Sequence, residues 1–83
     1  MKVLMVEPGK SPYETEIEGG LESLQAAVGG DIQATYPYED PVALICNDEG
    51  KLIGMPLNRA LYDDGRRMYD IVAGNFLIVG LGE

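Results

Sequence analysis

The sequence predicts a small α+β domain, in which a mostly antiparallel sheet of five to seven short strands carries one main helix packed on one face. Three features support this prediction: short runs that alternate or are wholly apolar, turn residues between those runs, and one amphipathic helical pattern. The chain has 83 residues, which is enough for one domain with a single small core. We therefore expect residues 1–83 to form one domain, whose many tight turns would use the 11 glycines.

Residues 2–18 are expected to form an antiparallel hairpin. Residues 3–6 are apolar without interruption, which is typical of a buried strand, and residues 8–12 contain the Pro and Gly that end it. Residues 13–18 then alternate strictly between two faces. One face takes Tyr13, Thr15 and Ile17, and the other takes Glu14, Glu16 and Glu18.

Residues 21–28 are the expected helix. Leu21, Leu24 and Val28 stand at positions i, i+3 and i+7, so they form one apolar stripe. Gly29-Gly30 is a usual C-terminal ending for a helix. No Ser, Thr, Asp or Asn stands just before this segment to cap its first turn.

The middle of the chain predicts two further strands. Residues 31–36 alternate, and residues 42–46 are apolar on both faces, which is typical of a central strand. Residues 47–50 have the composition of a turn. We therefore expect residues 51–55 to return as the hairpin partner of residues 42–46.

The last third is less regular. Residues 57–62 are expected to be a helical turn or a loop, followed by a turn at residues 63–65. Residues 68–72 and 75–79 predict a last strand pair, or one bent strand. Residues 76–79 are apolar on both faces, so we place them inside the sheet.

The charge of the chain is strongly acidic and unevenly distributed. There are 14 acids and 6 bases, a net charge of −8, and residues 1–49 hold 10 of the acids and only 2 of the bases. Direct binding to nucleic acid is disfavoured, because neutralising phosphates requires Lys and Arg. A basic protein surface is the partner that this charge favours.

Composition also argues against several kinds of chemistry and location. The chain has no His, which removes the commonest general base and metal ligand, and its single Cys46 lies in an apolar run. The loop acids do not follow the spacing of a calcium loop. We expect no catalytic residues, no metal and no cofactor. A lone cysteine, and the lack of an apolar segment long enough for a signal peptide or a membrane span, favour a cytoplasmic protein.

The regular row of carboxylates is the first candidate site. Glu14, Glu16 and Glu18 would lie about 6.8 Å apart along one strand face, and Glu22 follows at the start of the helix. Such a row could imitate a nucleic-acid backbone or dock into a basic groove. The alternative is a solvated edge strand that uses charge to prevent aggregation.

A group of polar and basic residues near the end of the chain is the second candidate site. Its members are Asn58, Arg59, Arg66 and Arg67. Arg forks suit phosphate, so these residues could bind a nucleotide or a phosphorylated metabolite in a pocket between subunits, although the sequence leaves the oligomeric state open. The alternative is local pairing of the arginines with Asp63, Asp64 and Asp70.

Several segments together are similar to a known family. They are VLMVEPG at residues 3–9, LESLQAAVGG at 21–30, GMPLNR at 54–59, DIVAGNF at 70–76 and VG at 79–80. Nearly the whole chain thus resembles the YodL-like group, small uncharacterised domains of bacteria and phages, some of them joined to ArdA-like antirestriction domains. The resemblance implies a mobile element or phage as the genomic setting and no established activity. Residues 1–83 themselves contain no ArdA-like segment, so we do not expect antirestriction by association.

The sequence therefore predicts a non-enzymatic acidic protein of a mobile element or phage that binds or inhibits a host protein through its acidic face. The alternative is a small-ligand binding protein that uses the Asn58-Arg59 loop.

Overall fold

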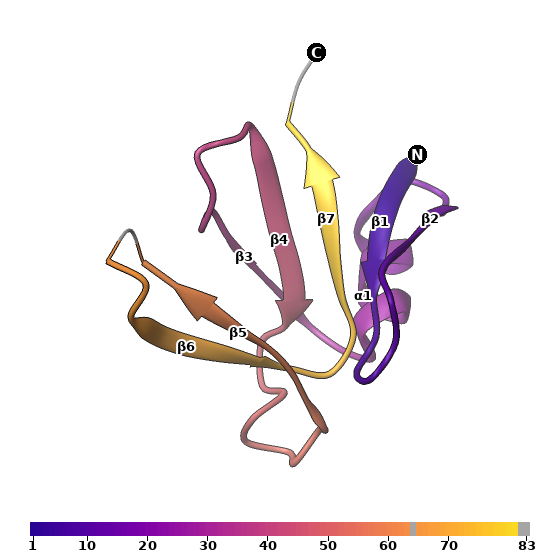
Figure 1. Ribbon diagram of the computed structural model, residues 1–83. Helices are drawn as coiled ribbons and strands as arrows, with labels where there is room; N and C mark the ends of the chain where they lie inside the picture. Colours follow the sequence, from indigo (N-terminus) through magenta and orange to yellow (C-terminus); the bar gives the residue numbers. More distant parts are fainter. Residues whose placement is uncertain (64, 82–83) are drawn as a thin grey trace.

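The protein forms two antiparallel sheets and one helix, as the computed structural model in Figure 1 shows for residues 1–63 and 65–81. Within these described residues there are seven strands and one helix, so the predicted α+β class is confirmed. In chain order the elements are β1 (Lys2–Val6), β2 (Tyr13–Glu16), α1 (Leu21–Val28), β3 (Ile32–Thr35), β4 (Val42–Asn47), β5 (Leu57–Tyr62), β6 (Met68–Ala73) and β7 (Phe76–Gly80).

The larger sheet, which we call the main sheet, has the strand order β2-β1-β7-β4-β3. Every neighbouring pair in it is antiparallel. The last strand of the chain, β7, is inserted between β1 and β4, and its Phe76 and Leu77 are buried. This confirms that residues 76–79 lie inside the sheet. The inner place of residues 42–46 is confirmed too, because β4 has β7 on one side and β3 on the other.

Helix α1 covers one face of the main sheet. Leu24 and Ala27 pack on a core that includes Leu77, and Val28 is buried. The predicted stripe is therefore confirmed at Leu24 and Val28 and is wrong at Leu21, which is 57% exposed. The helix ends as predicted, with Gly29 in the left-handed region at φ 82° and its N–H donating to Gln25 O at 2.8 Å. At the other end Gly20 supplies no side-chain cap. We call this face of the main sheet the helix face.

The opposite face is covered by the two-stranded sheet β5–β6, which we call the ribbon. Leu61 of β5 and Val72 of β6 are buried against Leu44 and Phe76 of the main sheet. Figure 1 shows the ribbon running crosswise to β4 and β7. The main sheet therefore has a core on each side, and successive residues of β4 alternate between them.

Two of the predicted pairings are wrong, and one element was missed. Residues 51–55 do not pair with β4, because both edges of β4 are occupied by β3 and β7, and residues 48–54 fold as turns instead. Residues 57–62 form strand β5 rather than a helical turn or loop. β6 and β7 do not pair with each other. The alternative of one bent strand is closer to the structure, since the two consecutive strands are separated at Gly74, where the chain turns from the ribbon into the main sheet at φ 82°.

Among the described residues, no helix is long and apolar enough to cross a membrane.

Candidate functional site

The outer edge of β2 carries the predicted row of carboxylates. Glu14 and Glu16 are exposed, and they lie on the ribbon side of the main sheet, opposite Leu4 and Lys2 in register. They are two strand steps apart, about 6.8 Å. Lys2, directly across from Glu16, is the base closest to the row in the strand register.

The peptide groups of the same two glutamates also face outward. Ile17 N–H donates to Met1 O at 2.9 Å, which makes residues 1 and 17 a hydrogen-bonded pair of the β1–β2 ladder. Because such pairs alternate along an antiparallel ladder, residues 13 and 15 bond to β1, whereas the N–H and C=O groups of Glu14 and Glu16 point away from it. We call this edge, with its carboxylates and open peptide groups, the acidic edge.

The other two predicted glutamates do not extend this row. Glu18 is exposed just beyond the end of β2, while Glu22 lies in the first turn of α1, on the helix face of the main sheet. The structure thus brings Glu14 and Glu16 together and separates Glu22 from them. Among the described residues, none of the four carboxylates takes part in an ion pair.

The loop that joins β1 to β2 is held by its own polar contacts. Tyr13 donates a short hydrogen bond to Glu7, and Lys10 lies 3.2 Å from the other oxygen of that carboxylate. The hydrogen bond from Tyr13 lowers the pKa of Glu7, with a further contribution from Lys10, and the same bond raises the pKa of Tyr13. These contacts fix the position at which β2 begins.

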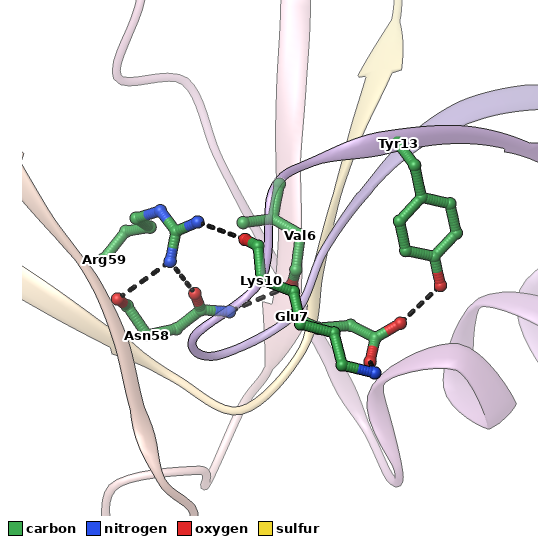
Figure 2. Close-up of polar contacts among 6 residues, drawn as sticks. All are labelled: Val6, Glu7, Lys10, Tyr13, Asn58 and Arg59. Atoms are coloured by element: carbon green, nitrogen blue, oxygen red, sulfur yellow. Dashed lines mark hydrogen bonds and ion pairs between the residues drawn. The ribbon is translucent and has the colours of Figure 1, made fainter.

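Asn58 and Arg59 connect β5 to Val6 and Lys10, as Figure 2 shows, and Asn58 also reaches Gly74. The Asn58 amide donates to Val6 O at 2.9 Å and to Gly74 O at 2.8 Å. Arg59 donates to Asn58 Oδ1 at 2.8 Å and to Lys10 O at 2.7 Å. Both side chains are thus engaged with backbone carbonyls and with each other, which is the arrangement of a structural clamp.

The remaining arginines of the predicted patch lie elsewhere. Arg66 and Arg67 are exposed in the turn between β5 and β6, whereas Arg59 lies three residues before the end of β5, roughly 10 Å along the strand. The predicted pairing of an arginine with Asp70 is wrong, since Asp70 accepts from Lys51 Nζ at 2.6 Å. Asp63 does bind Arg67, but through the backbone N–H at 2.9 Å, and Asp64 lies outside the described residues.

A cleft between the ribbon and the main sheet is the feature that sequence reasoning missed. Its volume is about 340 Å³. The main sheet contributes Gln33, Thr35 and Cys46, and the far wall includes Lys51, Tyr69 and Asp70. We call it the ribbon cleft. The crossing of the two sheets creates it, and no local pattern in the sequence signals that crossing.

Cys46 is the thiol that lines the ribbon cleft. Burial raises the pKa of the Cys46 thiol, with smaller contributions from Asp70 and Asp48, so the thiol stays protonated and is a weak nucleophile. Its Sγ lies 4.0 Å from Gln33 Oε1. Within residues 1–63 and 65–81, no group of three or more Cys, Asp or Glu is placed to hold a metal ion.

The fold and these surfaces define a small α+β domain with an acidic edge and a polar cleft. The chain belongs to the family described as domain of unknown function DUF3846, which matches residues 1–83. The predicted membership in an uncharacterised family of small domains is therefore confirmed. The comparison with curated proteins finds no match, and the comparison with solved structures finds none either.

Proposed function

We propose that the protein is a non-enzymatic binding protein that docks the acidic edge onto a basic surface of another protein. One observation carries this proposal: at Glu14 and Glu16, the outermost strand of the main sheet presents carboxylates and open peptide groups at the same residues. An open strand edge can take up a further strand from a partner, and main-chain hydrogen bonds then supply affinity. The carboxylates then make the acidic edge selective for a basic partner.

The partner surface follows from this geometry. A strand added beside β2 would place its alternate side chains next to Glu14 and Glu16, on the ribbon side of the main sheet. Lys or Arg at two alternate positions of the added strand would neutralise both carboxylates. Acidic side chains at those positions would be repelled, which gives the acidic edge its selectivity. Glu18, just beyond β2, extends the negative field past the end of the ladder.

The first test removes the charge of the row. The triple variant Glu14→Gln, Glu16→Gln and Glu18→Gln should weaken binding to a partner captured from lysate by roughly tenfold, about 1.4 kcal/mol, and should flatten its salt dependence. Affinity would be measured by titration calorimetry at low and high salt.

The matched control removes three charges elsewhere on the surface, by Glu39→Gln, Asp40→Asn and Glu49→Gln, all exposed residues. If both triple variants lose the same affinity, net charge and not the acidic edge governs binding. Unchanged affinity in the first variant would refute the proposal.

The genomic setting is a second part of the proposal. The similarity of residues 3–9, 21–30 and 54–59 to the YodL-like group supports a mobile element or phage as the source, with a host or phage protein as the partner. A cytoplasmic location accords with the single Cys46, which is a free thiol. Integration or replication genes beside the coding sequence would support this setting, and a position among housekeeping genes would count against it.

A second candidate function, small-ligand binding, is favoured by the ribbon cleft. Its volume of about 340 Å³ lies within the range of ligand pockets. Lys51 is a cation on its wall, and a phosphate or carboxylate group would share or replace the pairing of Lys51 with Asp70. The clamp at Asn58 and Arg59 does not line it, so the ligand would meet Lys51, Gln33 and Thr35 instead of the arginines.

The test of this candidate is a melting-temperature screen with nucleoside phosphates. A ligand that binds the cleft should raise the melting temperature of the wild type and of Lys10→Met, and should not raise that of Lys51→Met. A rise that persists in Lys51→Met would place the ligand outside the cleft.

A further inference from the structure

The two outer strands of the main sheet differ in how they are protected. β2 is guarded by Glu14 and Glu16, whereas the four residues of β3 carry no charge. Open, uncharged strand edges are templates for pairing with another chain, and proteins usually blunt them with charge, Pro or a covering segment. Among the described residues, no strand pairs with the outer side of β3.

The peptide groups that β3 offers can be assigned from its ladder with β4. Asp48 N–H donates to Asp31 O at 2.8 Å, so residues 31 and 48 are a hydrogen-bonded pair. By alternation, residues 33 and 35 bond to β4, and the N–H and C=O groups of Ile32 and Ala34 point outward. Ala34 is exposed, and Tyr36 just beyond the strand is 63% exposed. We call this edge, residues 32–36, the neutral edge.

We propose that two copies of the chain pair through their neutral edges, antiparallel, with the two-fold axis at Ala34. This register sets Ala34 against Ala34 of the second copy, Gln33 against Thr35, and Ile32 against Tyr36. The outward peptide groups of Ala34 then meet each other across the axis, and those of Ile32 meet residue 36, the next alternate position just beyond the strand. The two main sheets become one continuous sheet.

The neutral edge complements itself better than it complements an arbitrary strand. Ile32 beside Tyr36 is a favourable aromatic and β-branched cross-strand pair, Gln33 and Thr35 can share a hydrogen bond, and the small Ala34 lets the backbones approach at the axis. No like charges are opposed. The same operation on β2 would set a glutamate against a glutamate, so the neutral edge alone suits a second copy.

The net charge of −8 on each copy opposes this pairing, while the paired segment itself is uncharged. Screening by salt should therefore strengthen the dimer. Binding through the acidic edge should weaken as the salt concentration rises. The two proposals therefore predict opposite responses to salt, and each can be tested without the other.

The first experiment measures mass in solution by sedimentation equilibrium over a concentration series. The wild type should move from 9.0 kDa toward twice that mass as concentration rises, and sooner at high salt. Ala34→Lys should remain a monomer with an unchanged circular dichroism spectrum, since Ala34 is exposed and the lysine would face its own copy. The matched control Ala26→Lys, at an exposed position of α1, should dimerise like the wild type.

The second experiment tests the register. In a hydrogen-bonded antiparallel pair the Cα atoms lie about 5.5 Å apart, within the range that a disulfide spans. Ala34→Cys should therefore give a covalent dimer under mild oxidation, and Ala26→Cys should not. Cys46 lies on the other face of the main sheet and is buried, so it should not interfere. A wild type that stays monomeric, a dimer that survives Ala34→Lys, or equal cross-linking of the two cysteine variants would each overturn the proposal.

Discussion

At the scale of single residues, Asn58 makes the most consequential polar contacts. Its amide group satisfies two backbone carbonyls that belong to different elements, Val6 at the end of β1 and Gly74 in the turn before β7. β5 itself lies in the ribbon, so this one side chain ties the ribbon to the main sheet (Figure 2). Arg59 in turn holds the carbonyl oxygen of that amide at 2.8 Å, which fixes the orientation of the amide group.

Replacing this amide should therefore destabilise the fold. Asn58→Ala leaves two carbonyls without their donor, and we expect the free energy of unfolding to fall by about 1–3 kcal/mol. Asn58→Asp should cost more, because a carboxylate would face the two carbonyl oxygens. Urea denaturation would measure both. Asn75→Ala is the control, because no side-chain hydrogen bond of Asn75 occurs among the described residues. If the two alanine variants lose the same free energy of unfolding, the hydrogen bonds of Asn58 do not act as a clamp.

At the scale of elements, the sequence predicted those strands whose burial is regular. The alternation of residues 13–18 correctly placed Glu14 and Glu16 on one face of β2. On the other face Thr15 is half-buried across from the buried Val3, whereas Tyr13 is exposed. The unbroken apolar runs of β4 and β7 predicted strands with a core on each side. In these cases the local pattern reports the tertiary environment directly.

Strand β5 could not be predicted in this way. Its register with β6 shifts between Leu57 and Arg59 and again between Leu61 and Tyr62, so its side chains do not alternate regularly between faces. The Asn58-Arg59 pair within it faces partners that are distant in sequence, such as Val6 and Lys10. Long-range contacts of this kind override local propensity, which is why the segment had the pattern of a loop.

The difference between local patterns and long-range contacts also explains which parts of the candidate sites could be predicted from the sequence. The row at Glu14 and Glu16 is local to one strand, and its exposure followed from alternation. The grouping of Arg59 with Arg66 and Arg67 assumed that residues 57–67 fold back on themselves, whereas an extended β5 carries Arg59 away from the turn. The ribbon cleft depends on how two sheets cross, which no local pattern encodes.

At the scale of the whole molecule, the main sheet has two covered faces and two open edges of different chemistry. The helix and the ribbon cover the faces, which leaves the edges as the places where another chain can extend the sheet. One edge carries carboxylates and the other none. Under the two proposals above, the acidic edge would bind a basic partner and the neutral edge would bind a second copy of this chain of net charge −8.

The response of stability to pH follows from the same charges, with two effects of opposite sign. Protonating carboxylates lowers the net negative charge, and the relief of repulsion favours the folded state. Asp70 acts in the other direction. The hydrogen bond from Lys51 lowers its pKa, and a bond from the Ile71 N–H adds to this. A carboxyl whose pKa is lower when folded contributes stability above its ordinary pKa and loses it as the pH falls through the folded value.

We therefore expect Asp70→Asn to lose stability at neutral pH and to match the wild type once Asp70 itself is protonated. The Asp70 side chain is about half exposed, so solvent screening limits the difference to at most about 1 kcal/mol. Chemical denaturation from about pH 6 to about pH 2 would measure it. Asp40→Asn, at an exposed residue without an ion pair among the described residues, should follow the wild type over the same range. If the difference in free energy of unfolding between Asp70→Asn and the wild type instead stays constant down to about pH 2, the lowered pKa of Asp70 does not contribute to folding. The Lys51–Asp70 pair would then have no part in holding the ribbon to the turn that follows β4.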